Sequence, residues 1–210
     1  CLLNKFNVID HHLLVVTRAF EHQESPLTLA DFSAWWRCMA EYDSLGFYNS
    51  GAAAGASQTH KHLQLVPLPL GRQGPAVPME PLLTPLRVGA ITMSPDLPFL
   101  HAAVGLDPFG ASEPQRAARN GWSLYRAMLE RLDLAPVKAA HSERQAAPYN
   151  LLVTRRWMLL VPRSREHFGP ISINGLGYAG SLFVTDRGQL KTLRTHGPMN
   201  VLKAVGRPVP

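Results

Sequence analysis

Short runs of apolar residues predict four strands in the first third of the chain. Two are expected at residues 2–9 and 12–17, where Val, Leu and Ile are enriched on either side of a turn. Two more are expected at residues 47–48 and 60–66. The segment between the two pairs has a different apolar spacing.

Apolar side chains recur at helical spacing in two longer segments. The first opens at Thr28–Asp31, which resembles a capping box, and is expected to end near residues 44–46. The second covers residues 113–132 and begins at a Ser-Glu-Pro start signal. Two strands, a helix and two further strands therefore predict an α+β fold, a histidine-triad-like antiparallel half-barrel sheet with covering helices.

Prolines are dense between residues 67 and 98. Because proline fixes φ and lacks a backbone donor, this stretch is expected to be an irregular connector or wrapping loop. One short helix is expected near residues 82–87, and a strand at residues 99–106.

An internal echo indicates two related halves. Residues 12–22 and 157–167 share the same order of apolar and charged positions. We interpret the fold as pseudo-duplicated, with a catalytic half and connector at residues 1–98 and a second half at residues 99–210. Only the first half keeps histidines at the spacing described next.

Reactive side chains gather between Asn49 and Gln64. A loop of small residues runs into the sequence His60-x-His62-x-Gln64, and side chains in a strand alternate, so these three are expected on one face. Glycine and alanine let backbone N–H groups approach a phosphate closely. A neutral imidazole is a nucleophile near pH 7. The segment therefore predicts a site that holds a phosphate and attacks it with a ring nitrogen.

The segment also allows a metal site or an ordinary flexible loop. Two histidines in this spacing also suit a metal ion, with His101 or His141 as further ligands. No carboxylate or cysteine occurs between Asp43 and Glu80 to complete a local metal site, and glutamine is a poor ligand. The small residues would otherwise be an ordinary flexible loop. The histidines and the amide favour the phosphate.

Composition narrows the class of protein. The chain is 46% hydrophobic and 17% charged, which is typical of a globular protein, and its net charge of +6 suits an anionic ligand. The chain contains no basic run with interleaved aromatic residues, which is the pattern that would indicate nucleic-acid binding. Two cysteines without a framework, no membrane-spanning run and no secretory signal favour the cytoplasm.

The central motif resembles a known signature. The segments Asn49-Ser50-Gly51 and Gly55-Ala56-Ser57-Gln58-Thr59-His60-Lys61-His62-Leu63-Gln64 resemble those of ATP adenylyltransferases, the diadenosine tetraphosphate (Ap4A) phosphorylases. This family lies on the galactose-1-phosphate uridylyltransferase side of the histidine-triad superfamily. Residues 4–8, 12–18, 149–158, 162–164 and 173–181 resemble the same family, so the similarity spans nearly the whole chain. Since the chain begins at Cys1, the resemblance also implies a further N-terminal segment.

The resemblance implies phosphorolysis of Ap4A to ATP and ADP through an adenylyl-histidine, with His62 as the nucleophile. His60 is expected to orient the site, and Gln64 to donate its amide to a phosphoryl oxygen. The expected phosphate and nucleotide contacts are Lys5, Asn49, Ser50, Gly51, Gly55, Ala56, Ser57, Gln58, Thr59, Arg156 and Met158. Arg155 and Arg163 are further candidates for the outer phosphates. The other histidines, His12 among them, are expected at the surface or in the core.

The amide of Gln64 also bears on the type of reaction. Histidine-triad hydrolases carry a histidine at this position, and an amide cannot pass a proton to a leaving group. Transfer between phosphates is therefore expected rather than hydrolysis. The expected ligands are Ap4A, ATP, ADP and phosphate, with a divalent cation such as Mg²⁺ held through the substrate phosphates and no organic cofactor. A uridylyltransferase and a non-catalytic nucleotide- or RNA-binding protein are the remaining alternatives, and the oligomeric state is open.

Overall fold

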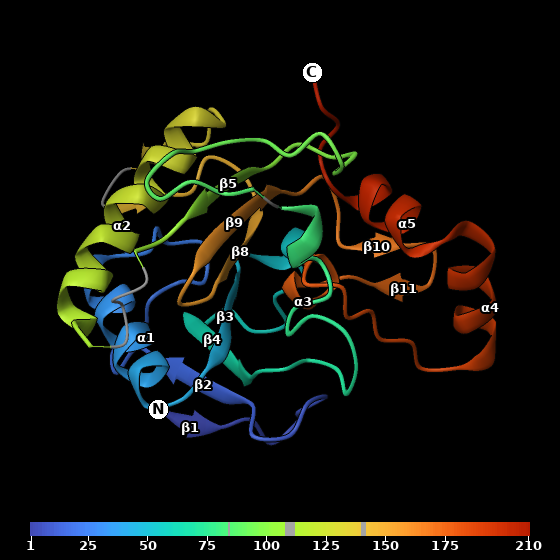
Figure 1. Cartoon of the computed structure of the whole chain (residues 1–210), viewed down its shortest axis with the longest axis horizontal. Coiled ribbons are helices and arrows are strands. Elements are labelled where there is room, and N and C mark those ends of the chain that lie inside the picture. The colour runs from blue at the N-terminus through green and yellow to red at the C-terminus, as the bar shows by residue number, and fades with distance from the viewer. Residues whose placement is uncertain (84, 108–111, 140–141) are drawn as a thin grey trace.

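The computed structural model describes residues 1–83, 85–107, 112–139 and 142–210. Its elements are, in chain order, β1 (Leu2–Leu3), β2 (Leu13–Val16), α1 (Leu29–Glu41), β3 (Ser44–Asn49), the 3-10 turn η1 (Ala52–Ala54), β4 (His62–Pro67), the 3-10 turn η2 (Glu80–Leu82), β5 (Ala102–Gly105), α2 (Pro114–Arg131), β6 (Val137–Ala139), β7 (Ser142–Arg144), β8 (Tyr149–Val153), β9 (Trp157–Pro162), β10 (His167–Phe168), β11 (Ile171–Ser172), α3 (Gly175–Tyr178), α4 (Arg187–His196) and α5 (Pro198–Val205). Figure 1 shows their arrangement.

One antiparallel sheet draws strands from both predicted halves. Its order is β1-β2-β4-β3-β8-β9-β5, and it runs through the middle of the molecule from β1 to β5 (Figure 1). The predicted α+β class with an antiparallel sheet and covering helices is confirmed. The division at residue 98 stays a prediction.

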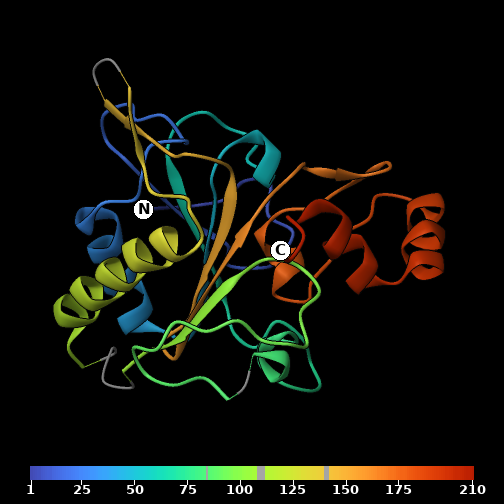
Figure 2. The same ribbon diagram turned by 90° about the horizontal axis from the view of Figure 1, so that it is seen from above.

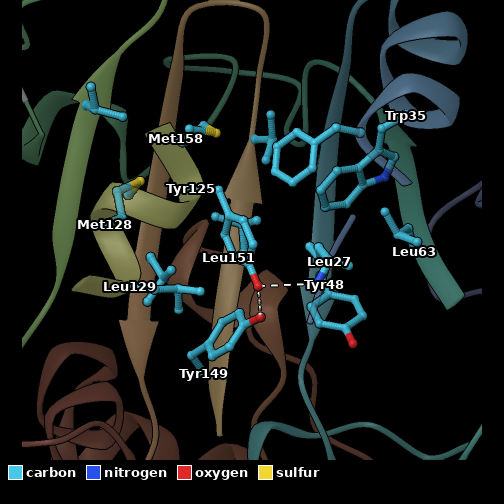
Figure 3. Close-up of a cluster of buried hydrophobic side chains, with 14 of the residues drawn as sticks. Leu27, Trp35, Tyr48, Leu63, Tyr125, Met128, Leu129, Tyr149, Leu151 and Met158 are labelled. Atoms are coloured by element: carbon cyan, nitrogen blue, oxygen red, sulfur yellow. Dashed lines mark hydrogen bonds between the residues drawn. The ribbon is translucent and has the colours of Figure 1, made fainter. Parts of the chain in front are cut away.

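Helices α1 and α2 cover one face of the sheet, and C-terminal helices lie beside the other (Figure 2). Strand residues such as Leu63 and Leu151 pack with Trp35 of α1 and Met128 of α2 in the first core, part of which Figure 3 draws. Its buried tyrosines are satisfied, because the hydroxyl oxygens of Tyr125 and Tyr149 lie 2.6 Å apart.

The second core fills the opposite face. Phe47 and Leu159 of the sheet pack there with residues of α3 and α5 and with Val77 and Leu97 of the proline-rich stretch. That stretch is therefore the wrapping loop that its composition predicted. Its helical turn is η2, which ends at Leu82 rather than beginning there, and residue 84 lies outside the described residues.

Element boundaries differ from the predictions mainly at strands. The predicted strands at residues 2–9 and 12–17 shorten to β1 and β2, whereas β3 begins three residues earlier than expected, at Ser44. Because β3 begins at Ser44, helix α1 ends earlier than expected, at Glu41. The capping box is present, since the Thr28 hydroxyl oxygen accepts from the Asp31 N–H and the Asp31 carboxylate accepts from the Thr28 N–H.

The strand order is symmetric about the seam between β3 and β8. The series β2-α1-β3-β4 in the first half has its counterpart in β5-α2-β8-β9, and the order β2-β4-β3 returns in reverse as β8-β9-β5. The registers agree residue by residue. Leu65 pairs with Leu13 and Gly46, as Leu160 pairs with Ala102 and Leu151.

This symmetry confirms the duplication but corrects its alignment. The similarity between residues 12–22 and 157–167 suggests that β2 corresponds to β9. In the structure, β2 corresponds to β5. Aligning Leu65-Val66-Pro67 with Leu160-Val161-Pro162 keeps the ladders of both repeats in register and makes His12 equivalent to His101, His62 to Trp157 and Gln64 to Leu159. We call residues 12–67 and 101–162 the first and second repeat.

Candidate active site

The first strand of interest is β4, whose side chains alternate as expected. Leu63 and Leu65 belong to the core beneath α1, while Gln64 lies in register with Phe47, a member of the opposite core. His62 and Gln64 therefore share the face opposite the long helices. Both are nearly buried, with 8% and 7% of their surface exposed.

The ring of His62 is held in one tautomer. Its Nδ1 lies 2.9 Å from the main-chain oxygen of His60. Since a carbonyl oxygen only accepts, Nδ1 carries the proton and the neutral ring leaves Nε2 with a free electron pair. Burial is the largest influence on the pKa of His62 and lowers it, the hydrogen bond to the His60 oxygen raises it, and the charge of the His60 ring lowers it. Nε2 thus has the free electron pair that a nucleophile needs.

The backbone of His62 is fixed by Gln23. The Gln23 Oε1 accepts from the His62 N–H at 2.9 Å. The Gln23 Nε2 donates to the main-chain oxygens of His62 at 3.3 Å and Asn49 at 2.7 Å. One buried amide therefore ties the start of β4 to the end of β3. The sequence prediction missed Gln23, because no local pattern marks a residue that acts through contacts this far along the chain.

His60 points toward the segment before the site rather than into it. Its Nε2 lies 3.1 Å from the Thr17 hydroxyl and 3.3 Å from the main-chain oxygen of Ala19, and its ring packs against Phe20 with centroids 5.4 Å apart. Its carbonyl orients the His62 ring. His60 thus orients the His62 ring through its backbone.

A chain of hydrogen bonds leads away from Gln64. Its Oε1 lies 3.1 Å from Nε2 of His12, and the Nδ1 of His12 lies 3.2 Å from Nδ2 of Asn4. His12 was expected to be an ordinary surface or core histidine. It is a buried histidine, and its ring nitrogen faces the side-chain amide of Gln64. His12 lies directly before β2, and its place beside Gln64 could be found only once β2 was known to pair with β4.

Asn49 and Ser50 support the loop from within. The Oδ1 of Asn49 accepts from Asn150 Nδ2 at 2.8 Å and from the Gly175 N–H at 2.9 Å, and the Ser50 hydroxyl accepts from the Tyr149 N–H at 2.6 Å. Both side chains are buried. Their observed partners are protein groups, which differs from the phosphate contact predicted for them.

The two glycines of the loop are required by its shape. Gly51 and Gly55 have φ of 97° and 85°, in the region that favours glycine. A Cβ on Gly55 would also lie 2.8 Å from the main-chain oxygen of Ile173, so the loop packs tightly on the segment before α3. A freely flexible loop would not need this contact.

Residues after Gly55 face outward. Ser57, Gln58 and Thr59 are exposed and Ala56 is half-buried. The side chains of Ser57, Gln58 and Thr59 make no hydrogen bond to the part of the chain that the structure describes. They are available to a ligand, as is the exposed ammonium of Lys5, which lies 5.8 Å from the Phe6 ring centre.

Arg156 and Met158 lie away from this cluster. Met158 is buried in the core beneath α2, on the face of the sheet opposite His62. It pairs with Val153 at the end of β8 remote from Asn49, and Arg156 contacts Glu80 at 3.1 Å. The structure therefore does not bring these two predicted contacts together with the nucleophile.

The other two arginines are structural. Arg155 donates to the main-chain oxygen of Met39 at 2.6 Å and so caps the end of α1. Arg163 is fully buried and donates to Asn150 Oδ1 at 2.6 Å and to the main-chain oxygen of Ile173 at 2.9 Å. It holds the segment on which Gly55 packs.

The geometry does not assemble the ligands of the alternative metal site. His101 lies on β5's flank in the second repeat, with Nδ1 2.8 Å from the main-chain oxygen of Phe99 and Nε2 2.8 Å from the Ser94 nitrogen. His141 lies outside the described residues. Within residues 1–83, 85–107, 112–139 and 142–210, no three His, Cys, Asp or Glu side chains cluster around a common point.

Two family models match the chain in tandem. The Ap4A phosphorylase N-terminal domain matches residues 1–85, and the ATP adenylyltransferase C-terminal domain matches residues 95–208. Among curated proteins of Saccharomyces cerevisiae, diadenosine 5',5'''-P1,P4-tetraphosphate phosphorylase 2 is 30% identical over 97% of this chain and 67% of its own length. Protein APA1 is 29% identical over 86% of this chain and 60% of its own length.

Solved structures of a yeast relative share the fold. The crystal structure of yeast Ap4A phosphorylase Apa2 superimposes with a TM-score of 0.80 at 29% identity, over 99% of this chain and 71% of that one. Its complex with Ap4A gives a TM-score of 0.78 at 28% identity, over 99% and 72%. The chain thus spans roughly two thirds of the length of these relatives.

Proposed function

The chain belongs to the family of Ap4A phosphorylases and ATP adenylyltransferases, and we propose that it splits Ap4A with phosphate into ATP and ADP through an adenylyl-His62 intermediate. The family resemblance of its sequence is thereby confirmed. The observation that carries the mechanism is the hydrogen bond from His62 Nδ1 to the His60 oxygen, because it leaves the Nε2 electron pair free.

In the first step, Nε2 of His62 attacks the α-phosphorus of one adenosine. A P–N bond forms, the bond from that phosphorus to the bridging oxygen of the next phosphate breaks, and ATP leaves with the bond's electron pair. The proton on Nδ1 stays in place throughout. The positive charge on the substituted ring is stabilised by the His60 oxygen at 2.9 Å.

In the second step, an oxygen of inorganic phosphate attacks the adenylyl phosphorus. The P–N bond breaks, ADP forms, and the electron pair returns to Nε2. Both the leaving group and the acceptor are anionic phosphates, so neither step requires an acid. Gln64 suits this chemistry, since its amide stabilises a phosphoryl oxygen and does not titrate.

The exposed end of the loop receives the phosphates. Ser57, Gln58 and Thr59 offer hydroxyl, amide and backbone donors, and Lys5 adds a positive charge. Mg²⁺ bound through substrate oxygens and water would neutralise part of the polyphosphate, with no protein cage needed. The affinity for Ap4A of variants at Ser57, Gln58, Thr59 and Lys5, measured with and without Mg²⁺, tests these contacts.

Nucleotides are the ligands that relatives of this chain suggest. Yeast Apa2 has been crystallised with AMP and with Ap4A, which makes nucleotides the ligands to test first. None of the helices in the described part of the chain has the length and apolar run that crossing a bilayer needs. Phosphate as co-substrate, the cytoplasm as location and the lack of a nucleic-acid partner stay predictions.

Intact-protein mass spectrometry tests the proposal directly. Mixed with Ap4A in the absence of phosphate, the protein should gain one AMP, and added phosphate should remove it while ATP and ADP accumulate equally. His62→Ala should never carry the adduct, whereas His196→Ala, which alters an exposed histidine of α4, should behave as the wild type. Turnover by His62→Ala would refute the mechanism. So would a wild-type enzyme that turns over when phosphate is present but forms no adduct with Ap4A when phosphate is withheld.

A further inference from the structure

We propose that His12 is a positioning residue that sets which end of the Gln64 amide faces the substrate. The inference rests on the proposed function, because it concerns a contact to the phosphorus under attack. It assigns a role to a buried histidine whose observed hydrogen bonds go to Asn4 and Gln64 and not to His62 or the loop.

The hydrogen bonds fix the state of the His12 ring. The Nδ2 of Asn4 can only donate, so the Nδ1 of His12, 3.2 Å away, must accept. A neutral imidazole has one ring proton, which then resides on Nε2 and is donated to Oε1 of Gln64 at 3.1 Å. Burial, the largest influence, lowers the pKa of His12, so the ring stays neutral.

This donation determines the polarity of the amide. With Oε1 engaged, the N–H groups of Gln64 are turned toward the site, where they can bind a phosphoryl oxygen. An inverted amide would direct its oxygen at that anionic oxygen and repel it. His12 is itself held, since its ring packs against Phe47 with centroids 5.6 Å apart.

The second repeat provides an internal comparison. His101 is the equivalent of His12, but the residue equivalent to Gln64 is Leu159, which offers no polar atom. His101 adopts the opposite tautomer, with Nδ1–H donating to the Phe99 oxygen and Nε2 accepting from the Ser94 N–H, both at 2.8 Å. The same position in the fold therefore does not impose the tautomer of His12. The Nε2–H form occurs where an amide must be oriented.

The tautomers can be measured without substrate. Protein labelled with ¹⁵N-histidine should show Nε2–H for neutral His12 and Nδ1–H for His62 and His101, with the signals assigned from single histidine variants. Nδ1–H on His12, or a ring that exchanges between both forms, would overturn the proposal.

Single-turnover adenylylation by Ap4A without phosphate tests the consequence. His12→Phe should slow the step about 10-fold at saturating Ap4A with little change in substrate affinity, in the range for removing an outer-shell hydrogen bond. Gln64→Leu should cost about 100-fold, as for a lost oxyanion donor. His12→Gln should restore most of the rate, since its amide nitrogen can take the place of Nε2.

A double variant separates positioning from packing. In His12→Phe/Gln64→Leu the loss should equal that of Gln64→Leu alone, because His12 acts only through the amide. Independent, multiplying losses would overturn the proposal. His101→Gln, which alters the equivalent buried histidine, should leave the rate unchanged.

The outcomes also separate the two proposals. Absence of any adduct in the wild type would refute the proposed function. A normal adduct together with an uncoupled double variant would refute the positioning role of His12 alone. Thermal melting of each variant shows whether a slow enzyme is still folded.

Discussion

Replacing Lys61 with methionine tests how the strand of the nucleophile is held in place. Lys61 lies between His60 and His62 and is fully buried on the other face of the sheet. Its ammonium contacts Asp31 of α1 at 2.6 Å, the main-chain oxygen of Pro26 at 3.0 Å and Glu21 at 3.1 Å. The strand and the capping box of α1 are therefore joined by a buried ion pair.

The magnitude follows from what each partner keeps. Removing one member of a buried ion pair costs about 3–5 kcal/mol, because the other charge is left uncompensated. Here Asp31 retains two donors, the N–H and hydroxyl of Thr28 at 2.7 and 2.9 Å, and methionine fills the lost volume. We expect the low end, about 3 kcal/mol. At about 2–4 °C per kcal/mol for a chain of this size, Tm should fall by about 6–12 °C.

Urea unfolding gives the free energy of unfolding. The double variant Lys61→Met/Asp31→Leu removes both charges. Its loss of unfolding free energy should be smaller than the sum of the losses in the two single variants, since a hydrophobic pair can replace a buried ion pair at little cost. Lys191→Met, on the exposed face of α4, is the control. A loss in Lys61→Met no larger than in this control, or additive losses in the double variant, would refute the reasoning.

Three further predictions concern pH, backbone strain and a surface ion pair. Burial lowers the pKa of three histidines, His12, His62 and His101, below the ordinary value of 6.5. Because the unfolded chain then binds protons at higher pH than the folded one, the free energy of unfolding should fall as pH drops below about 6.5; urea unfolding at several pH values measures this, and a flat profile would contradict it. Gly55→Ala should destabilise by about 1–3 kcal/mol, and more than the control Gly74→Ala, which has the same φ of 85° but open space around it; equal losses in urea would show that the loop contact contributes nothing. Arg156→Ala should change stability by about 0–1 kcal/mol and leave adenylylation unchanged, because its pair with Glu80 is exposed, and a tenfold slower adduct would return Arg156 to the site.

Local patterns in the sequence predicted what depends on neighbours along the chain. The capping box at Thr28 and the alternation through His62 and Gln64 are such features, and both are present. The alignment of the repeats was not, because short apolar strands such as Leu13–Val16 resemble any other. Strand order is set by pairing across the sheet, which places β5 where β2 lies in the first repeat and leaves the apparent echo between β2 and β9 without a counterpart in the fold.

The same limit explains the site. Gln23 and His12 act through residues 39 and 52 positions away, and nothing near them in the sequence marks that distance. Conversely, Asn49 has a composition-based case for binding phosphate, yet its amide holds Asn150 and Gly175. A polar residue beside a glycine-rich loop can support the loop or bind its ligand. Only the buried partners distinguish the two.

The two repeats differ at the positions of His62 and Gln64. In the second repeat, Trp157 and Leu159 replace the nucleophile and the amide, and both lie buried against the C-terminal core. In the first repeat, the corresponding positions are the polar His62 and Gln64, which keep 8% and 7% of their surface exposed. Asn150 of the second repeat, Arg163 directly after it and the Gly175 N–H nearer the C-terminus all donate hydrogen bonds to the loop region of the first repeat, at Asn49 and Ala54. The loop that precedes His62 is therefore held in place partly by residues of the second repeat and of the segment that follows it.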